Sequence, residues 1–324
     1  MISLSDIVAA RARLNGVAVR TPLLEWTHHA DSRKLFLKLE NLQPIGAFKL
    51  RGAYNKIASL TEDERRRGVV SYSSGNHAQG VAYAARALGV RAIIVMPGNA
   101  PRNKLDSTAA LGAEIVKVGP GSEERRIQAE QLAAQRGYAI IPPYNDAHII
   151  AGQGTTGLEI LEQLPEVETV LCPVGGGGLI SGIATAMKLT KPGVKVIGVE
   201  PALAADAQAS LRSGHIVSFA AEQVTQTQAD GLRTQSIGDI NFEHIRAYVD
   251  DIVTVEESEI EQAMRALGED TQTVAEPSGA VAVAGFLFHA DDLPQTKFNV
   301  AVISGGNIDP ELLAKMRSHG QPFL

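Results

Sequence analysis

The sequence predicts an α/β protein of two domains, with mostly parallel twisted sheets covered by helices. Short β-branched runs alternate with longer segments that carry apolar residues at intervals of three to four, such as 77–89 and 154–164. Several of the short runs are almost wholly apolar, as strands are when both faces of a parallel sheet are buried. The chain has 324 residues, 44% hydrophobic and 20% charged, which is enough for the cores of two domains.

The expected strands and domains follow in chain order. Strands are predicted at 35–40, 68–72, 91–97, 114–118, 138–142, 169–174, 194–200, 251–255 and 298–304. The compact βαβα stretch at 63–146 is opened by the charged run "TEDERRRG" at 61–68. We therefore expect a smaller domain, 63–146, inserted into a larger one built from 1–62 and 147–324.

Composition excludes several classes of protein. The net charge is −6, from 30 Lys and Arg against 36 Asp and Glu, and no basic block stands out, which disfavours nucleic acid or an anionic membrane as partner. The single cysteine, Cys172, excludes an internal disulfide and fits a reducing compartment. The first 20 residues contain Asp6 and three arginines and do not form a secretory signal. A cytoplasmic location is expected.

Four consecutive glycines, 175–178, stand between a buried strand and a helix. Bare N–H groups at a helix N-terminus form a cradle for an anion. The alternative is a flexible turn at a crowded strand end. The spacing fits neither the dinucleotide pattern G-x-G-x-x-G nor the P-loop. The loop therefore predicts a small phosphorylated cofactor rather than a nucleotide.

Polar residues also follow two other strands. The stretch "SYSSGNHAQG" at 71–80 offers hydroxyl, amide and backbone donors at a helix start, although plain N-capping would use the same residues. Ser304 follows the last strand, where open α/β sheets place ligand contacts. Glu276 precedes an apolar helix, where an acid favours the helix dipole. Lys49 stands at the start of an expected helix. It could be an ordinary solvated lysine or an amine held for covalent chemistry.

Four motifs in this order carry a resemblance to a known family: "GAFKLRGA" (46–53), "SSGNHAQG" (73–80), "PVGGGGLISG" (173–182) and "SGGN" (304–307). Together they resemble the fold-type II pyridoxal-phosphate enzymes, within them the threonine/serine dehydratase and serine racemase family. The resemblance runs from "TPLLEW" (21–26) to "SGGNID" (304–309) and implies a tryptophan synthase β-like fold.

The resemblance implies a role for each residue at the cofactor. Lys49 would form the Schiff base with pyridoxal 5'-phosphate and then act as the base at the substrate Cα. Phe48 would lie beside the pyridine ring, Asn76 would bind the ring hydroxyl, and Ser304 the ring nitrogen. The phosphate would be held by Gly175, Gly176, Gly177 and Gly178. Ala47 replaces the serine that the family usually has before Phe-Lys.

The resemblance also implies residues at the substrate. The substrate carboxylate would be received by Ser73, Ser74, Gly75, Asn76 and His77. Ser74 stands where serine racemase carries its second proton carrier and many threonine dehydratases carry Ala. Arg125 matches an arginine near the acidic ligands of the racemase, with a solvated helix arginine as the alternative. Tyr144 stands where dehydratases tend to have Phe and the racemase has Asn.

Two further expectations rest on the resemblance. Glu200, Ala204 and Asp206 match a divalent-cation site of the family, and two carboxylates with a backbone carbonyl suit Mg²⁺, or Mn²⁺ or Ca²⁺. Without the resemblance, Glu200 and Asp206 would be interpreted as a cap and a surface acid. A homodimer is the expected assembly.

The predicted function is a pyridoxal-phosphate-dependent ammonia-lyase that converts L-threonine or L-serine to a 2-oxo acid and ammonia, with serine racemase as a second activity that Ser74 allows. A threo-3-hydroxyaspartate ammonia-lyase is the alternative. A β-replacement synthase would show Ser-x-Lys-Asp-Arg and Thr-Ser-Gly-Asn-Thr-Gly, where this chain has "AFKLR" and "SSGNH". A non-catalytic protein that binds a phosphate ligand is disfavoured by the intact Lys49.

Overall fold

The larger of two sheets has six strands. The computed structural model describes residues 1–27, 33–73, 75–100, 102–119 and 121–318. Within them the strand order is β1-β2-β10-β7-β8-β9, with β1 antiparallel to β2 and all other neighbours parallel. The bounds are β1 Leu23–Trp26, β2 Lys34–Leu39, β7 Thr169–Pro173, β8 Lys195–Pro201, β9 Asp251–Val255 and β10 Phe298–Ile303.

The smaller sheet has four parallel strands in the order β5-β4-β3-β6. The bounds are β3 Val69–Tyr72, β4 Ala92–Pro97, β5 Glu114–Val118 and β6 Ala139–Ile140. The α/β class and all nine predicted strands are confirmed, although β6 has only two residues. The sequence analysis missed β1, the antiparallel edge strand.

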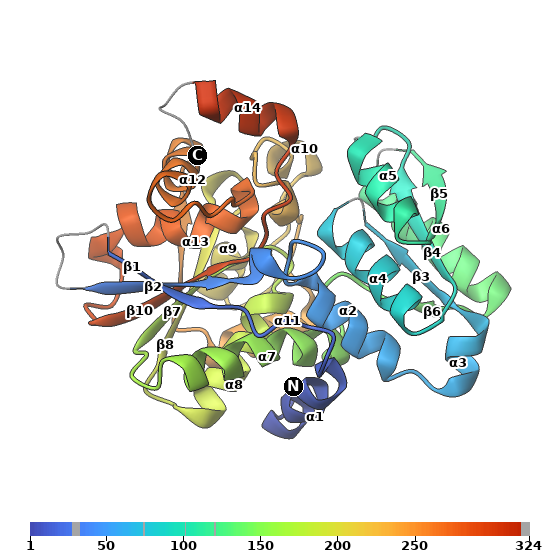
Figure 1. The fold of residues 1–324 in the computed structure, drawn as a ribbon, viewed down its shortest axis with the longest axis horizontal. Coiled ribbons are helices and arrows are strands. Elements are labelled where there is room, and N and C mark those ends of the chain that lie inside the picture. Colours follow the sequence, from blue (N-terminus) through green and yellow to red (C-terminus); the bar gives the residue numbers. More distant parts are fainter. Residues whose placement is uncertain (28–32, 74, 101, 120, 319–324) are drawn as a thin grey trace.

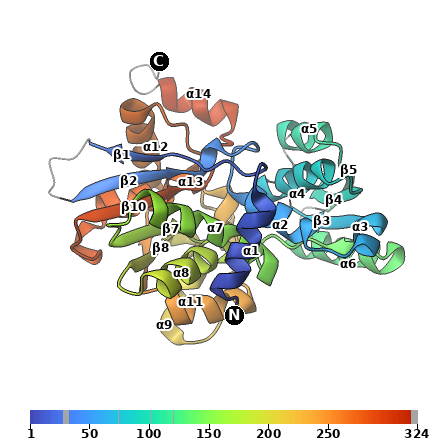
Figure 2. The ribbon, with the colours of Figure 1, turned by 60° about the horizontal axis from the view of Figure 1, so that its bottom comes forward.

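Helices cover both faces of the large sheet (Figures 1 and 2). Alternate strand residues enter two different cores: Leu171 lies in the core beneath α13, and the neighbouring Cys172 in the core beneath α8 and α11. The α-helices are α1 Leu4–Leu14, α2 Lys49–Ala58, α3 Glu62–Arg67, α4 Asn76–Ala87, α5 Arg102–Ala110, α6 Ser122–Arg136, α7 Ala147–Gln163, α8 Gly178–Thr190, α9 Asp206–Ser213, α10 Ala221–Val224, α11 Asp239–Tyr248, α12 Glu257–Thr271, α13 Pro277–Phe288 and α14 Pro310–Ser318. The 3₁₀ turns are η1 Glu40–Leu42, η2 Ala202–Ala204, η3 Asp230–Leu232 and η4 Ala290–Asp292.

Helix α2 connects the two sheets. It begins beside the end of β10, and its Ala53 and Ile57 enter the core of the small sheet with Val69 and Ile94. Ile149 of α7 joins the same core. Strands β3 to β6 all lie within 63–146, but this core also draws on helices outside that range. The domain boundaries at 62/63 and 146/147 stay a prediction.

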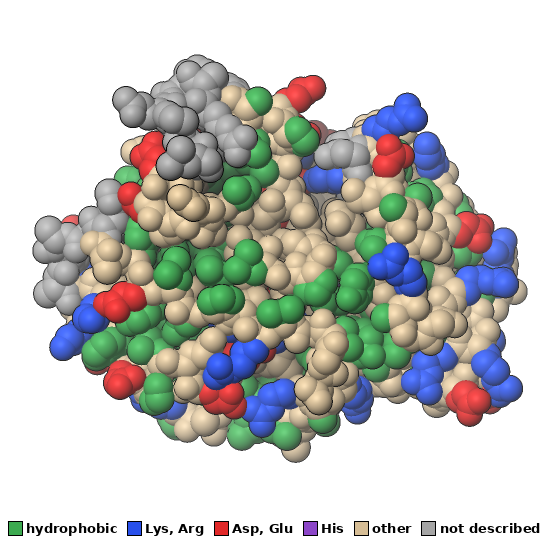
Figure 3. Space-filling view, in the orientation of Figure 1, with side chains coloured by type: hydrophobic (Ala, Val, Ile, Leu, Met, Phe, Trp, Pro, Cys, Tyr) green, Lys and Arg blue, Asp and Glu red, His purple; other side chains and the backbone are tan. Residues whose placement is uncertain are grey.

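The surface has one plain hollow in the view of Figure 3, a notch at the upper edge between the parts built on the large and the small sheet. On this face cationic and acidic side chains are interspersed without one continuous basic patch. Among the described residues, no helix combines the length and the apolar composition that a membrane span requires.

Candidate functional site

Lys49 opens α2 directly beside the carboxyl end of β10. The turn before it needs a glycine, because Gly46 has φ +72° and a Cβ there would run into the side chain of Asn307. The Phe48 N–H then donates to the Ser304 carbonyl at 3.0 Å. This bond connects the N-cap residue of α2 to the carboxyl end of β10.

The Lys49 amine faces the segment that leads into α7. Its Nζ donates to the Pro143 carbonyl at 2.7 Å and lies 5.1 Å from the centroid of the Phe48 ring. Burial lowers the pKa of Lys49 to about 8. An amine with this pKa keeps a neutral fraction near neutral pH, which attack on an aldehyde and removal of a proton both require.

The four glycines connect β7 to the N-terminus of α8. Gly177 is the N-cap, with φ +90°. A Cβ on Gly176 would overlap the ring of Tyr144, and one on Gly177 would lie 3.0 Å from the Cβ of Asn241. The close approach of these side chains therefore requires bare backbone. N–H groups at a helix start, without side chains in front of them, are suited to a phosphate.

Tyr144 covers this glycine loop. Its ring packs on Gly176, and its hydroxyl donates to the Ser236 carbonyl at 3.5 Å. Burial, with smaller contributions from Tyr72 and Asp206, raises the pKa of Tyr144 to about 12, so the phenol stays neutral. The structure thus brings Tyr144 to the predicted cofactor site, whereas its contact with the substrate stays a prediction.

The loop after β3 lies at the start of α4. Gly75 is the N-cap of α4, and no side chain at that position caps the helix. The Gly75 N–H donates to Ser73 Oγ at 3.3 Å. The N–H groups at this helix start face no capping side chain from the N-cap residue, and they are suited to a carboxylate. Ser74 lies outside the described residues.

Asn76 joins this loop to the large sheet. Its Nδ2 donates to Glu276 Oε1 at 2.6 Å, and its Oδ1 accepts from Asn307 Nδ2 at 2.8 Å. Glu276 is the N-cap of α13, and Asn307 follows β10. The loop and the edge that carries Ser304 are thus hydrogen-bonded to each other. The contact of Asn76 with the ring hydroxyl stays a prediction.

Glu276 is a site residue that the sequence analysis missed. It is the N-cap of α13, but its side chain makes no cap bond and faces Asn76 instead. It is 4% exposed. Burial, with a contribution from Asp230, raises its pKa to about 7. The only sequence signal was an acid before a wholly apolar helix, and the helix dipole explains that pattern equally well.

His77 is buried next to Lys49. Its Nε2 is 3.0 Å from the Ile141 carbonyl, and its Nδ1 has no hydrogen-bond partner among the described residues. Burial and the charge of Lys49 lower the pKa of His77 to about 3. The ring is therefore neutral, and the carbonyl assigns the proton to Nε2. This leaves an acceptor at Nδ1.

Ser304 ends β10 in a closed environment. It is 4% exposed, and its Oγ donates to the Ser278 carbonyl at 3.3 Å. The next residue, Gly305, forms an antiparallel bridge with Ala47. A neutral hydroxyl at this position fits a neutral ring nitrogen, although the contact itself stays a prediction.

Arg125 lies in α6, which packs on strands β3 and β4 at the outer side of the small sheet (Figure 1). Burial lowers its pKa. Arg125 is therefore part of the helical cover of the small sheet. Its contact with the substrate stays a prediction.

The predicted cation ligands come from the ends of three successive elements, β8, η2 and α9, and all of them are buried. Glu200 accepts from the N–H groups of Ala207 and Gln208, at 3.0 and 2.8 Å. Both carboxylate oxygens of Asp206 lack a hydrogen-bond partner among the described residues. Burial and Asp206 raise the pKa of Glu200 well above its usual range.

These residues fit a hard cation. Burial raises the pKa of Asp206 to about 7, and the nearby N–H groups of Asp206 and Ile237, neither of which forms a hydrogen bond with the carboxylate, offset this only in part. A buried carboxylate without partners is costly unless a cation balances it. The described residues contain no cluster of three or more His, Cys, Asp and Glu side chains that could hold a metal. A cation would therefore also need the Ala204 carbonyl and waters.

Comparisons with known proteins show the family to which this chain belongs. Residues 15–305 match the model of the family "Pyridoxal-phosphate dependent enzyme". The chain is 46% identical to an L-threonine ammonia-lyase of Thermotoga maritima, over 99% of this chain and 79% of the relative. It is 41% identical to an L-threo-3-hydroxyaspartate ammonia-lyase of Saccharomyces cerevisiae, over 97% of this chain and 95% of the relative. The structure of maize serine racemase matches with a TM-score of 0.92 and 36% identity, over 98% and 97% of the two chains.

The fold, the buried lysine and the glycine loop define a pyridoxal-phosphate-dependent enzyme, and the family match covers most of the chain. The similar proteins define the family more narrowly. The chain belongs to the fold-type II threonine/serine dehydratase and serine racemase family, as its motifs predict.

Proposed function

We propose that this protein is an ammonia-lyase that converts L-threonine and L-serine to the corresponding 2-oxo acid and ammonia. The observation that carries the proposal is the position of Lys49, whose amine has a pKa of about 8 and is buried beside His77. The 46% identity to an L-threonine ammonia-lyase supports the choice of substrate.

The cofactor would be held by residues from both sheets. Lys49 would bind it covalently, the glycines 175–178 and the start of α8 would bind its phosphate, and Phe48 would pack beside its ring. Ser304 and Asn76 would contact the ring nitrogen and the ring hydroxyl. When bound, pyridoxal phosphate takes up the electron pair that remains when the Cα proton leaves.

The chain itself supplies positioning and proton transfer. N–H groups at the start of α4 would hold the substrate carboxylate and so direct the Cα–H bond toward Lys49. The neutral amine of Lys49 would take the Cα proton, and the hydroxyl on Cβ would gain one proton as it leaves as water, so that the step has no net change in protons. The released enamine then gains water and loses ammonia, which yields the 2-oxo acid.

Product analysis tests this function. The purified protein is incubated with L-threonine, L-serine, D-serine and threo-3-hydroxyaspartate, and the 2-oxo acids and the enantiomers of serine are measured. We expect 2-oxobutanoate from L-threonine and pyruvate from L-serine. Absence of both products, with cofactor bound, would refute the proposal.

A threo-3-hydroxyaspartate ammonia-lyase is the second candidate, because a relative with that activity is 41% identical. A dicarboxylic substrate would need a second cationic contact, for which Arg125 is the proposed residue. A clear preference for hydroxyaspartate over threonine in the same assay would favour it. Conversion of D-serine to L-serine would show the racemase activity proposed for Ser74.

We also propose a divalent-cation site at Glu200, Ala204 and Asp206, for Mg²⁺ or a similar hard ion. The support is the buried carboxylate of Asp206, which has no partner among the described residues. A cytoplasmic homodimer belongs to the same proposal and rests on the resemblance to the family.

A further inference from the structure

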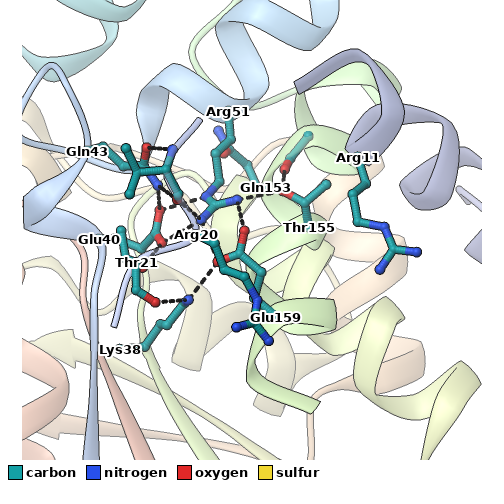
Figure 4. Close-up of polar contacts among 12 residues, drawn as sticks. Arg11, Arg20, Thr21, Lys38, Glu40, Gln43, Arg51, Gln153, Thr155 and Glu159 are labelled. Carbon is teal, nitrogen blue, oxygen red and sulfur yellow. Dashed lines mark hydrogen bonds and ion pairs between the residues drawn. The ribbon is translucent and has the colours of Figure 1, made fainter. Parts of the chain in front are cut away.

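Four charged side chains form a buried network on the side of α2 that faces η1 and α7 (Figure 4). Lys38 and Glu40 come from β2 and η1, Arg51 from α2 and Glu159 from α7. All four are buried, and the two positive and two negative charges balance. None of these residues belongs to the predicted cofactor, substrate or cation site.

Arg51 is the centre of the network. Its Nε and Nη2 donate to the two oxygens of Glu40, at 2.7 and 2.8 Å. Its Nη1 and Nη2 donate to the two oxygens of Glu159, at 2.7 and 2.9 Å. Nη1 also donates to Thr155 Oγ1 at 3.1 Å, and Nη2 to the Val19 carbonyl at 3.2 Å. A planar guanidinium that binds two carboxylates bidentately has one orientation.

Lys38 completes the network on the far side from α2. Its Nζ donates to Glu159 Oε2 at 2.6 Å, to the Thr21 carbonyl at 2.8 Å and to Gln163 Oε1 at 2.9 Å. The Thr21 hydroxyl donates to Glu40 Oε1 at 2.7 Å. The acceptors of Arg51 are thus themselves held by partners from other segments.

The backbones of α2 and α7 touch at the same point. A Cβ on Gly152 would lie 2.6 Å from the Arg51 carbonyl oxygen and 2.7 Å from the Gly52 Cα. The Gly52 N–H donates to Gln153 Oε1 at 3.2 Å. Contact this close leaves α2 no room to translate toward α7. Rotation about the axis of α2 must be restrained by side chains, and Arg51 is the one with the most bonds there.

Lys49 and Arg51 project to different sides of α2. Side chains two positions apart in a helix are separated by roughly 200° around its axis. Lys49 therefore faces Pro143 and His77, while Arg51 faces Glu40 and Glu159. A small rotation of α2 about its axis would move both.

From this geometry we propose that Arg51 is a positioning residue: by fixing the rotation of α2 against Glu40 and Glu159, it holds the Lys49 amine in its buried position. The proposal rests on the covalent role proposed for Lys49. A purely stabilising role would leave the Lys49 amine unchanged. The positioning role requires the pKa of this amine to change when Arg51 is substituted.

The test uses Arg51→Lys, which keeps the buried positive charge but lacks the planar fork. The control is Lys56→Met, which removes the ion pair of Lys56 with Asp146, at 2.7 Å, near the other end of the same helix. The full-length chain is freed of cofactor and labelled with acetic anhydride between pH 6 and 11, and acetylation of Lys49 is followed by mass spectrometry. The holoenzyme of each variant is assayed for kcat and KM.

The labelling midpoint of the wild-type Lys49 should lie near the structure's value of about 8. In Arg51→Lys the amine gains access to water, so the midpoint should rise by about one pH unit, toward that of a solvated lysine. At pH 8 this change lowers the neutral fraction about fivefold, and kcat should fall by at least as much while KM changes less. Lys56→Met should keep the wild-type midpoint.

Other outcomes of the labelling experiment would contradict the proposal in distinguishable ways. An unchanged midpoint in Arg51→Lys, or an equal rise in both variants, would overturn the positioning role. A wild-type Lys49 that is not labelled, and does not bind the cofactor, would instead overturn the proposed covalent role. If Arg51→Lys does not fold, Glu40→Gln tests the same restraint from the carboxylate side and should also raise the midpoint.

Discussion

At the scale of single residues, burial determines the protonation state of the candidate site. Lys49 and His77 have lowered pKa values, whereas Tyr144 and Glu276 have raised ones, and burial is the largest cause for all four. Each shift favours the neutral form of the side chain. His77 and Tyr144 therefore stay neutral, whereas the Lys49 amine and the Glu276 carboxyl titrate near neutral pH.

Replacing Lys49 by Ala should abolish turnover. The variant loses both the covalent link to the cofactor and the base at Cα, and loss of a general base alone costs about 10²–10⁴-fold in kcat. Steady-state formation of 2-oxobutanoate from L-threonine measures the effect. The far-UV circular dichroism spectrum should stay that of the wild type, and a variant that keeps more than a tenth of the activity would contradict the assignment.

The Lys49 amine should also set the pH dependence of kcat. Protonation of the free amine removes the base, so kcat should fall about tenfold for each pH unit below the pKa, which the structure places at about 8. Above this value kcat should level off. A rate that stays flat from pH 6 to 9 would show that another step limits turnover or that another group is the base.

Asp206→Asn tests the cation site through stability. Because the pKa of Asp206 is raised to about 7 in the folded chain, the folded state binds this proton more tightly than the unfolded state. The stability that this proton provides is present below about pH 4 and lost as pH rises through about 7. With a chelator at pH 8, the variant should therefore be more stable than the wild type, by about 2–4 kcal/mol.

Mg²⁺ should act in the opposite direction. It should raise the melting temperature of the wild type by binding the native state only, and leave Asp206→Asn almost unchanged. Differential scanning calorimetry at pH 4 and pH 8, with chelator or with Mg²⁺, measures all four conditions. If the melting temperatures of the two proteins changed in the same way under all four conditions, Asp206 would not be a ligand of the cation.

At the scale of elements, the site depends on close approach between backbones. The contact of α2 with α7 at Gly152 is one example, and the glycine loop under Tyr144 is another. In both places a single methyl group would occupy space already taken by neighbouring atoms. Interiors packed at this density respond to such a change by shifting the elements themselves.

Gly152→Ala should therefore lower the free energy of unfolding by about 1–3 kcal/mol, the usual range for overpacking. Its Cβ would push against the backbone of α2 at Arg51 and Gly52. Urea denaturation followed by circular dichroism gives the value. Gly193→Ala is the matched control, because a Cβ there meets nothing within 4 Å, and its stability should stay within about 1 kcal/mol of the wild type.

At the scale of the whole molecule, two sheets contribute to one site. The glycine loop and Ser304 follow strands of the large sheet, while Asn76 follows a strand of the small one. A ligand that contacts both parts stabilises the native arrangement and has no comparable affinity for the unfolded chain. Cofactor binding and the stability of the whole fold should therefore be linked.

Pyridoxal 5'-phosphate at about 100 times its dissociation constant should stabilise the protein by about 2.7 kcal/mol. Thermal denaturation of cofactor-free protein with increasing cofactor measures this effect. Pyridoxal without the phosphate is the control, and it should raise the melting temperature far less, because the glycine loop then has no ligand. Equal shifts with both compounds would argue against a phosphate site at 175–178.

Much of the fold and part of the candidate site could be predicted from the sequence. Apolar β-branched runs predicted nine strands, because strands buried on both faces have a distinct composition. Strand β1 was missed, since it is short, antiparallel and half-exposed. The motifs located Lys49 and the glycine loop. The bond between Asn76 and Glu276 joins positions 200 residues apart, and Arg51 resembles a solvated helix residue until Glu40 and Glu159 are brought to it by the fold.

The position of α2 in the core of the small sheet has a consequence for modularity. Ala53 and Ile57 of α2, with Ile149 of α7, complete the core of the small sheet, so we expect that this sheet cannot fold by itself. A fragment cut at 63–146 would leave this apolar surface open to water and should aggregate or remain molten when expressed alone. Exchange of the small sheet between relatives, by recombination or in a designed chimera, should succeed only when α2 and the start of α7 are inherited with it.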